Sequence, residues 1–392
     1  MENKIKVAIA FGSRSVEHEV SIVTAMQVFE NIDRDKYDII PVYIDKKGRW
    51  LVDKKLQKLE NFKTLKLGVK APEYVFGASP SVKALSPKSV FNFFRSIKAD
   101  IYFPVVHGTF GEEGTIQGLF EMADVPYVGS GVTGSAVGMD KIIQKSVFKD
   151  NGIPVVKYIW FLKNEWQDNK VKIIEKIEKT LGYPVFVKPA NLGSSIAINK
   201  AGGLKELENA IEIASNFDRR IIVEEGKEGI IEINCSIIGN NELTASVCEQ
   251  PVKGNAMLTY EEKYLKGEKV KGLPAGRQGM AGLSRLVPAP ISEELTKKIQ
   301  ETAKKAFRTV DAAGISRVDF MVRPDMEEFW ITEINTLPGS LSFYLWEKSG
   351  ISFSELIDRL INLGFERYKE KQELTFSYDS DLITKTSGNS KI

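Results

Sequence analysis

The chain has 392 residues, of which 43% are hydrophobic and 27% charged, and its formal net charge is +2. This composition is ordinary for a globular protein, and the small net charge gives no reason to expect a nucleic acid or an anionic membrane as a partner. No apolar run approaches the roughly 18 to 20 residues of a membrane-spanning helix and the N-terminus has no signal-peptide pattern, so we expect a cytoplasmic protein.

The first region alternates strands and helices, which predicts a parallel sheet flanked by helices. The pattern indicates strands at 6–12, 37–44 and 98–108 and a helix at 17–32. Residues 52–98 contain Lys-rich and Pro/Ser-rich pieces, and we interpret them as an elaborated connection.

The remaining chain again mixes strands and helices around a Gly/Ser loop. Helices are expected at about 140–150, 168–181, 204–216 and 293–310, the last with Ser292 as its N-cap, and strands at 156–162, 184–190, 195–200 and 219–225. The chain length predicts two or three domains. We place them at 1–130, 131–240 and 241–368, followed by a flexible polar tail at 369–392.

The segment RVDFMVRPDMEEFWITEIN, residues 317–335, has the form strand, Pro-Asp turn, strand, which predicts an antiparallel hairpin. Strand side chains alternate between faces, so Arg317 and Asp319 share one face of the first strand. Glu333 and Asn335 share one face of the second strand for the same reason. If the register places both sets on one side, two carboxylates and a carboxamide converge, and such oxygen ligands suit Mg²⁺.

The apolar residues of this hairpin indicate whether its polar face is buried. Strict alternation places Met321, Phe329 and Ile331 on the face of the charged residues, so we expect that face to be partly buried, where unpaired carboxylates are costly. The opposite face is expected to carry Val318, Phe320, Val322, Trp330 and Ile334. The alternative is a hairpin with one solvated polar face and no metal.

Three further loops carry candidate binding groups. VKPANLGSSIAINK, residues 187–200, offers Lys188, Ser hydroxyls and N–H groups to a phosphate, although a ligand-free turn is the simpler interpretation of this loop alone. HGTFGEEGTIQG begins with His107 at a strand end, where open α/β sheets bind ligands, although a lone loop histidine is often incidental. YEEKYLKG contains Lys263 and Tyr264 and suits either an active-site lid or a tolerated insertion.

Taken together, these segments resemble the D-alanine:D-alanine ligases of the ATP-grasp superfamily. The matching stretches extend from residue 5 to about 365 and read FGSRSVEHEVS, HGTFGEEGTIQGLFEMADVPYVGSGV, GMDK, FVKPANLGSSIAI, EEKY, RVDF and EINTLPG. The resemblance implies an α/β (α+β ATP-grasp) protein, with an N-terminal open parallel-sheet domain and two ATP-grasp subdomains that clamp the nucleotide. It also implies a homodimer, and an enzyme that joins two D-alanines through D-alanyl phosphate for peptidoglycan precursors.

The resemblance further implies roles for individual residues. ATP would contact Lys141, Lys188 and Ser195, with Glu224 at the adenine-side hinge and Glu232 at the ribose. Two Mg²⁺ ions, which Mn²⁺ could replace, would be held by Asp319, Glu333 and Asn335. Glu17 would meet the ammonium of the first D-alanine and His107 would lie near its carboxylate, with Lys263 and Ser342 as further substrate contacts. Ser194 and Tyr264 would form the hydrogen-bonding pair that closes the lid, and Arg317 and the Gly339 N–H would hold the oxyanion.

Two departures from the family pattern concern the second substrate and the lid. The segment after NTLPG is about four residues shorter than the family segment whose Ser and Leu hold the carboxylate of the second substrate. Ser342 is the candidate substitute, and the identity of the second substrate stays open. Residues 265–286 are longer than usual and look inserted. An acceptor such as D-lactate, D-serine or another D-amino acid is the alternative within this fold, although Tyr264 favours an amine. A non-catalytic ATP-binding module would be expected to lack Arg317 or the metal ligands, which are all present.

Overall fold

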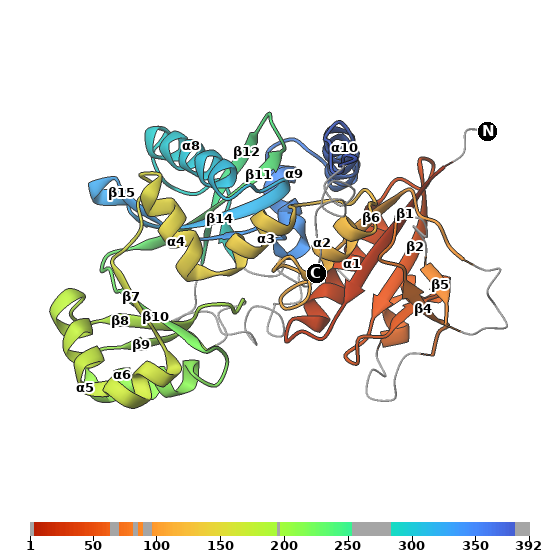
Figure 1. Ribbon diagram of the computed structural model, residues 1–392. Helices are drawn as coiled ribbons and strands as arrows, with labels where there is room; N and C mark the ends of the chain where they lie inside the picture. Colours follow the sequence, from red (N-terminus) through yellow and green to blue (C-terminus); the bar gives the residue numbers. More distant parts are fainter. Residues whose placement is uncertain are drawn as a thin grey trace.

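The computed structural model describes residues 4–62, 70–80, 85–88, 96–193, 197–252 and 284–380. Three sheets form its framework, and Figure 1 shows them as an N-terminal lobe, a small lobe with β7 to β10, and a third lobe that contains β11 to β15. The N-terminal sheet has six strands in the order β5-β4-β3-β2-β1-β6.

The N-terminal sheet has a parallel part and an antiparallel extension. Strands β1 (Ile5–Gly12), β2 (Tyr37–Ile44) and β6 (Ile101–Pro104) pair in parallel, as predicted. The apolar run of β1 is fully buried from Val7 to Phe11, because α1 (His18–Asn31) covers one face and α2 (Thr115–Met122) the other. The region interpreted as a connection adds the antiparallel strands β3 (Trp50–Val52), β4 (Glu73–Phe76) and β5 (Leu85–Pro87), with the 3-10 turns η1 (Lys54–Gln57) and η2 (Leu59–Phe62).

The small lobe is a four-stranded antiparallel sheet in the order β7-β10-β8-β9. Its strands are β7 (Tyr158–Leu162), β8 (Val185–Pro189), β9 (Asn199–Ala201) and β10 (Arg220–Glu225), and its helices are α5 (Lys163–Thr180) and α6 (Leu204–Ala214). Both helices pack on one face, where Val185, Val187 and Val223 belong to the core. Alternation therefore turns Lys188 and Glu224 to the other face.

The third lobe is a five-stranded antiparallel sheet in the order β13-β12-β11-β14-β15. Its strands are β11 (Ile231–Gly239), β12 (Thr244–Pro251), β13 (Arg285–Leu286), β14 (Gly314–Arg323) and β15 (Glu328–Asn335), with η7 (Pro324–Met326) in the last turn. Helix α8 (Glu293–Thr309) covers one face, and the Ser292 hydroxyl accepts a hydrogen bond from Leu295 N at 3.1 Å, which confirms the predicted N-cap. Helices α3 (Val132–Met139) and α4 (Lys141–Asp150) contact β15.

A β-bulge corrects the predicted faces of the hairpin. Asp319 pairs with Glu333, but the next residue, Phe320, pairs with Ile331, so Thr332 is the extra residue. One inserted residue reverses the facing of every side chain before it on that strand. The prediction that Phe329 and Ile331 lie on the charged face is therefore wrong: both pack with Phe320 in the core beneath α8. Trp330, which was expected on the same face as Phe320, faces the other way. The ammonium of Lys227 lies 5.0 Å from the centre of the Trp330 ring.

The C-terminal segments connect the third lobe to the first. After β15 come η8 (Gly339–Ser342), α9 (Phe343–Lys348) and α10 (Phe353–Gln372). Leu341, Trp346 and Leu360 share one hydrophobic core with Ile9 and Phe11 of the N-terminal sheet. The segment after Gly339 is thus held between two lobes.

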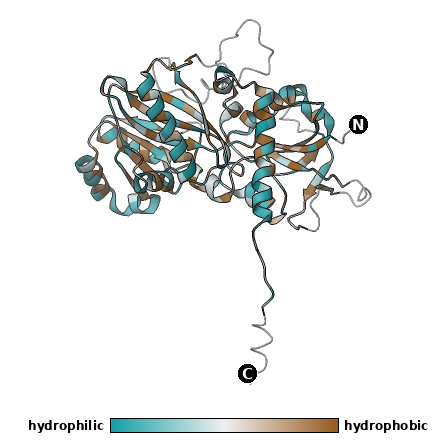
Figure 2. Cartoon of the chain, turned by 90° about the horizontal axis from the view of Figure 1, so that it is seen from above, coloured by the Kyte–Doolittle hydropathy of each residue, from teal (hydrophilic) through white to brown (hydrophobic). Residues whose placement is uncertain are grey.

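The predicted domain limits stay predictions, but three observations bear on them. Strand β11 enters the five-stranded sheet before residue 240, and α10 continues to Gln372, past residue 368. Beyond it, the described residues 373–380 are exposed and run away from the folded body (Figure 2).

In Figure 2 the helices also show hydrophilic residues on their outer surfaces, and no helix in the described ranges is long and apolar enough to cross a membrane.

Candidate active site

The predicted metal ligands are brought together by strand register. Arg317 pairs with Asn335, and Asp319 pairs with Glu333, so all four side chains lie on the face of the sheet opposite α8. The row continues beyond the hairpin, because Asn234 on β11 pairs with Asp319 on one side and Glu249 on the other. A polar row therefore crosses the four strands β12, β11, β14 and β15. The sequence pattern predicted only the part of this row on β14 and β15.

Asp319 is a buried member of this row, and three hydrogen bonds hold its carboxylate. The Arg317 guanidinium donates to both of its carboxylate oxygens, at 2.6 and 2.7 Å, and Asn335 Nδ2 donates to Oδ2 at 3.2 Å. Burial raises the pKa of Asp319 to about 6; Arg317 opposes this rise, while Glu333 and Glu232 add to it. Burial and the nearby carboxylates destabilise the charged form of Asp319, and a bound divalent cation would offset this cost.

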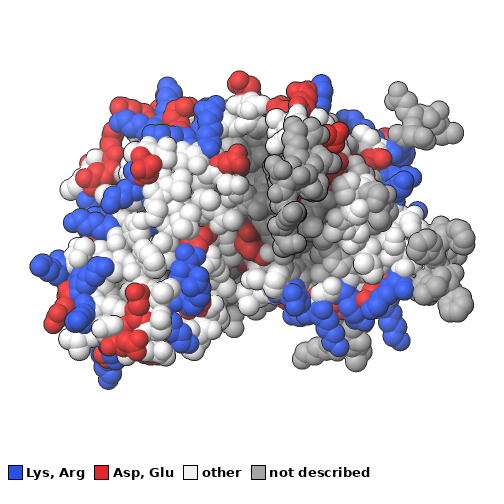
Figure 3. Space-filling model, viewed as in Figure 1, with Lys and Arg blue, Asp and Glu red and all other residues white. Residues whose placement is uncertain are grey.

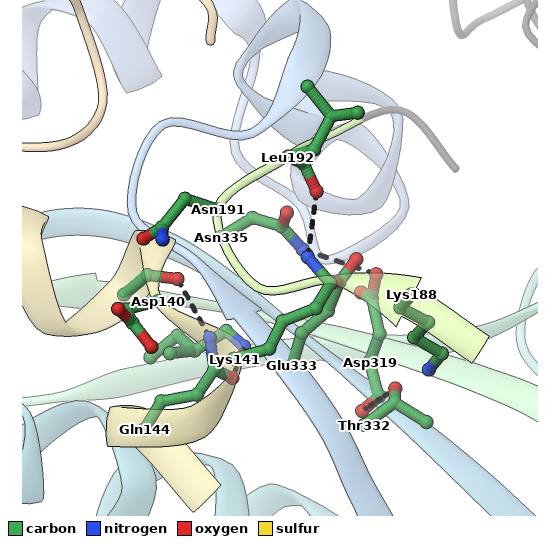
Figure 4. Close-up of polar contacts among 12 residues, drawn as sticks. Asp140, Lys141, Gln144, Lys188, Asn191, Leu192, Asp319, Thr332, Glu333 and Asn335 are labelled. Atoms are coloured by element: carbon green, nitrogen blue, oxygen red, sulfur yellow. Dashed lines mark hydrogen bonds and ion pairs between the residues drawn. The ribbon is translucent and has the colours of Figure 1, made fainter. Parts of the chain in front are cut away.

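Lys141 joins this row from helix α4. Asp140 caps the helix by accepting from the N–H groups of Ile142 and Ile143, each at 3.0 Å, and this fixes the first turn next to β15. The Lys141 ammonium lies 3.2 Å from Glu333 Oε2 and donates to Leu192 O at 2.8 Å. Figure 4 shows Lys141, Glu333, Asn335 and Asp319 converging below the loop that carries Leu192. The predicted phosphate contact and the predicted metal ligand are therefore neighbours.

Lys188 lies on β8 of the small lobe, on the other side of the site from Lys141, and its ammonium contacts Glu224. Its ammonium donates to Glu224 Oε2 at 2.8 Å, while the other oxygen of Glu224 lies 3.2 Å from Lys145 Nζ. Sequence reasoning missed Lys145, although it lies one helical turn after Lys141 and thus on the same face of α4. Burial lowers the pKa of Lys145, whereas Glu224 keeps a lowered pKa because the two lysines outweigh its own burial.

Glu17 lies where the N-terminal lobe meets the Gly/Ser loop of the small lobe. Its carboxylate is buried, and a Cβ added at Gly193 would stand 2.8 Å from Glu17 Oε2. Gly108 is equally close: its added Cβ would stand 2.5 Å from the same oxygen, and its φ of +72° also favours glycine. Two glycines therefore make room for this carboxylate next to the loop that leads to Ser194.

Both ring nitrogens of His107 have partners. Nδ1 lies 3.0 Å from Glu112 Oε1, and Nε2 lies 2.9 Å from the hydroxyl of Thr24. That hydroxyl in turn accepts a hydrogen bond from Ser340 N at 3.3 Å. A chain of contacts thus links the predicted substrate histidine to the segment that follows Gly339.

The segment Gly339–Ser342 has an unusual backbone. Ser340, Leu341 and Ser342 all have left-handed φ values, of 54°, 51° and 48°, and all three are buried. L-residues adopt this region rarely, and it stores strain when packing imposes it. η8 also contacts β14, the strand that carries Arg317.

Several predicted residues lie outside the described ranges. These are Ser194, Ser195, Lys263 and Tyr264, together with residues 265–283 of the predicted insertion. The end of that insertion is described, because Arg285 and Leu286 form β13.

A small cavity marks the place where the three lobes meet. Its lining includes Glu112 from the first lobe, Gly193 from the second, and Lys141, Glu333 and Asn335 from α4 and β15. Figure 3 shows a hollow between the lobes with acidic side chains in it. A larger, mostly apolar cavity of about 770 Å³ lies on the N-terminal lobe, around Trp50, Phe110 and Met122, and none of the predicted site residues lines it.

The residues present fit a divalent metal only in combination with other ligands. Among the described residues no group of three or more His, Cys, Asp or Glu side chains is placed to hold a metal ion. Asp319, Glu333 and Asn335 offer two carboxylates and one carboxamide, a set that suits Mg²⁺ when phosphate oxygens and water complete the coordination. The site is therefore suited to a metal that arrives with a nucleotide.

Comparisons with known proteins agree with this geometry. The family described as D-ala D-ala ligase N-terminus matches residues 6–130, and the family described as D-ala D-ala ligase C-terminus matches residues 147–362. The chain is 44% identical to a D-alanine--D-alanine ligase of Ruminiclostridium cellulolyticum, over 96% of this chain and 100% of that protein. It is 40% identical to the ligase of the same name from Chloroherpeton thalassium, over 94% of this chain and 99% of that protein.

Solved structures are similar over the same length. The D-Ala:D-Ser ligase VanG from Enterococcus faecalis has a TM-score of 0.78 and 34% identity, with 92% of this chain and 100% of that chain covered. The D-alanine-D-alanine ligase from Coxiella burnetii has a TM-score of 0.77 and 29% identity, with 99% of both chains covered. The similarity therefore spans all three lobes.

Proposed function

The chain belongs to the D-ala D-ala ligase family, and from this premise we propose that it joins two D-alanines to D-alanyl-D-alanine for peptidoglycan precursors. Ligases of this family use ATP and a divalent metal ion. The observation that carries the proposal is the cavity between the lobes, where Lys141, Glu333 and Asn335 meet Gly193 and Glu112. This cavity of about 20 Å³ marks where the predicted nucleotide-binding and amino-acid-binding residues of different lobes converge, and the substrates themselves need more room.

In the proposed first step, the carboxylate of one D-alanine attacks the γ-phosphorus of ATP. A new O–P bond forms, the bond to the β-phosphate oxygen breaks, and the products are D-alanyl phosphate and ADP. Lys141 and Lys188 would balance the charge of the phosphates from opposite walls of the site, a role that their positions on α4 and β8 support. Phosphoryl transfer depends on positioning and charge stabilisation of this kind.

The divalent metal would be held by Asp319, Glu333 and Asn335, and we propose two Mg²⁺ ions, as the family resemblance implies. When bound, the metal would neutralise charge on the β- and γ-phosphates. Arg317 and Lys141 hold the two carboxylates in place beforehand, through the contacts at 2.6 and 3.2 Å. The buried side chains would thus be orientated before the nucleotide arrives.

The first D-alanine would lie between Glu17 and His107. The Glu17 carboxylate would meet its ammonium, and the Glu112–His107–Thr24 contacts would fix the imidazole beside its carboxylate. Because Thr24 also contacts Ser340 N, the first substrate and the segment after Gly339 would be aligned by one network.

In the proposed second step, the amine of another D-alanine attacks the acyl phosphate. A C–N bond forms, the C–O bond to phosphate breaks, and inorganic phosphate leaves. Arg317 and the Gly339 N–H would stabilise the oxyanion, a role supported by the contact between η8 and β14. Ser194 and Tyr264 would complete the lid that keeps water from the acyl phosphate, with Lys263 and Ser195 beside them.

Analysis of the product identifies the second substrate. With D-alanine as the sole amino acid, mass analysis should find D-alanyl-D-alanine, ADP and phosphate in equal amounts. In competition with D-serine and D-lactate, D-alanyl-D-alanine should remain the main product. A mixed product with D-serine as the preferred acceptor would instead favour the activity named for the structurally similar enterococcal enzyme. The homodimer and the cytoplasmic location stay predictions, which sedimentation and cell fractionation would test.

A further inference from the structure

A buried carboxylate ends the polar row on strand β12. Glu249 is 1% exposed, and Arg285 Nη1 donates to its Oε2 at 3.0 Å. Its Oε1 accepts from Tyr344 Oη and Asn234 Nδ2, each at 3.2 Å. The guanidinium of Arg285 also stacks on the Tyr344 ring, with its carbon 3.6 Å from the ring centre. Arg285, Glu249 and Tyr344 therefore form one cluster, which we call the β12 cluster.

Stability alone does not explain the ion pair in this cluster. The side chain of Arg285 is only 11% exposed, so both charges have been removed from water, and the cost of this roughly cancels their attraction. Apolar residues of similar volume often stabilise a fold as well as a buried ion pair does. What lies next to the pair is therefore the better guide to its role.

The β12 cluster lies on the other side of Arg317 from the metal ligands of β15. In the sheet order β12-β11-β14-β15, Glu249 is on β12 and Arg317 is on β14. Burial raises the pKa of Tyr344, and the charge of Glu249 adds to this rise. Arg285 and Arg317 both oppose it, so the phenol lies close to both guanidinium groups. The cluster thus borders the proposed oxyanion donor.

The second step of the proposed reaction brings an anionic acceptor to this place. The phosphate of D-alanyl phosphate would lie with the metal at β15, while Arg317 holds the oxyanion. The attacking amine must then approach from the β12 side, because the leaving phosphate occupies the other. The acceptor also carries a carboxylate, which Glu249 would repel if its charge were not neutralised. Arg285 supplies that neutralising charge.

We propose that Arg285 is a positioning residue for the acceptor D-alanine, because it neutralises Glu249 and holds Tyr344 beside Arg317. This inference rests on the proposed function, since it requires the acyl phosphate and assigns the oxyanion to Arg317. Arg285 acts through Glu249 and Tyr344, and the ion pair adds no net charge to the wall that the acceptor meets.

The test supplies two alternative acceptors, D-alanine and hydroxylamine, together with ATP. Hydroxylamine has no carboxylate, and its nitrogen displaces phosphate from D-alanyl phosphate to give D-alanyl hydroxamate. Hydroxamate formation therefore measures the first step and the oxyanion site without the carboxylate of the acceptor. In Arg285→Met the charge of Glu249 is uncovered, and we expect kcat/KM for dipeptide formation to fall about tenfold. Hydroxamate formation at saturating hydroxylamine should stay within about twofold of the unchanged enzyme.

Arg323→Met is the matched control. Arg323 also pairs with a glutamate, Glu328 at 2.8 Å, and lies 5.7 Å from the centre of an aromatic ring, that of Trp330. It stands at the far end of β14, where β14 turns into β15, and Glu328 is exposed. This variant should form both the dipeptide and the hydroxamate as the unchanged enzyme does.

The double variant Arg285→Met with Glu249→Gln separates the role of charge from that of support. It removes both charges and leaves an amide oxygen for Tyr344 and Asn234, so dipeptide formation should recover to within about threefold of the unchanged enzyme. Equal loss of both products in Arg285→Met, an unchanged dipeptide rate in that variant, or no recovery in the double variant would overturn the inference. If the unchanged protein formed neither product, the proposed function itself would fail, which is a distinguishable result.

Discussion

Asp319 and Glu333 lie directly opposite each other on β14 and β15, and each is held by a different cation of the protein. Arg317 binds the first through two hydrogen bonds, while Lys141 approaches the second to 3.2 Å. Two carboxylates at this separation would repel each other without such partners. We propose that this pair shares a bound divalent cation, and the Glu333 variant tests this proposal.

Glu333→Gln should lower kcat by at least about 100-fold, since even partners one layer outside a metal site often contribute 10- to 100-fold. The melting temperature should change little, because the Glu333 side chain is 32% exposed. Glu328→Gln is the control on the same strand, where Glu328 contacts Arg323 on the surface. Near-normal turnover by Glu333→Gln would refute its role as a metal ligand.

Arg317→Met should lower kcat by about 100- to 1000-fold, which corresponds to the roughly 2.7 to 4 kcal/mol expected for one oxyanion donor. The KM for ATP should rise as well, because Arg317 also holds Asp319, a proposed ligand of the metal that accompanies ATP. Unfolding in urea should also show a loss of about 3 to 5 kcal/mol, because buried Asp319 would lose its cation. A variant that kept its kcat while losing this stability would limit Arg317 to a structural role.

Thr24→Val should raise the KM for D-alanine by up to about tenfold, because it removes the hydroxyl that joins His107 to Ser340, and one hydrogen bond contributes about 0.5 to 1.5 kcal/mol. Thr24→Ser keeps the hydroxyl and should behave like the unchanged enzyme. The KM for ATP serves as the internal control. Parallel increases in both KM values would contradict a specific link to the amino-acid site.

The metal-free protein should show a pH-dependent stability that originates at Asp319. Its pKa is about 6 in the folded state, above the value of about 3.9 in an unfolded chain, so the folded state binds the extra proton between these pH values. This group therefore makes the protein more stable as pH falls from about 7 to about 4, and the contribution is lost as pH rises through 6. Unfolding with chelator present should show this slope, and Asp319→Asn should lack it. Parallel curves for the two proteins would contradict the assignment.

The hairpin could be predicted because strand side chains alternate and its two strands are adjacent in the sequence. The position of Arg317, Asp319, Glu333 and Asn335 on one face is confirmed. The predicted facing of Phe329 and Ile331 was wrong, because a bulge at Thr332 shifts the register and simple alternation does not reveal it. The alternation of side chains therefore predicts which face they lie on only up to the first bulge in a strand.

The rest of the site depends on contacts between distant segments. Lys145 reaches Glu224 across 79 positions of sequence, and nothing in the helix pattern distinguishes this buried lysine from the exposed Lys149. The link from His107 to Ser340 through Thr24 also requires the packing of η8 on α1, which residue spacing does not reveal. Resemblance to a family indicated most of the predicted residues, whereas the three-dimensional structure adds those that hold them in position.

The central claim is that ATP activates the carboxylate of one D-alanine before the amine of another attacks it. Its most direct test uses D-alanine with oxygen-18 in both carboxylate oxygens, followed by mass analysis of the phosphate and dipeptide. The account predicts one labelled oxygen in each phosphate released, because the oxygen that attacks phosphorus leaves with it. Dipeptide formation with no label in the phosphate would contradict the account.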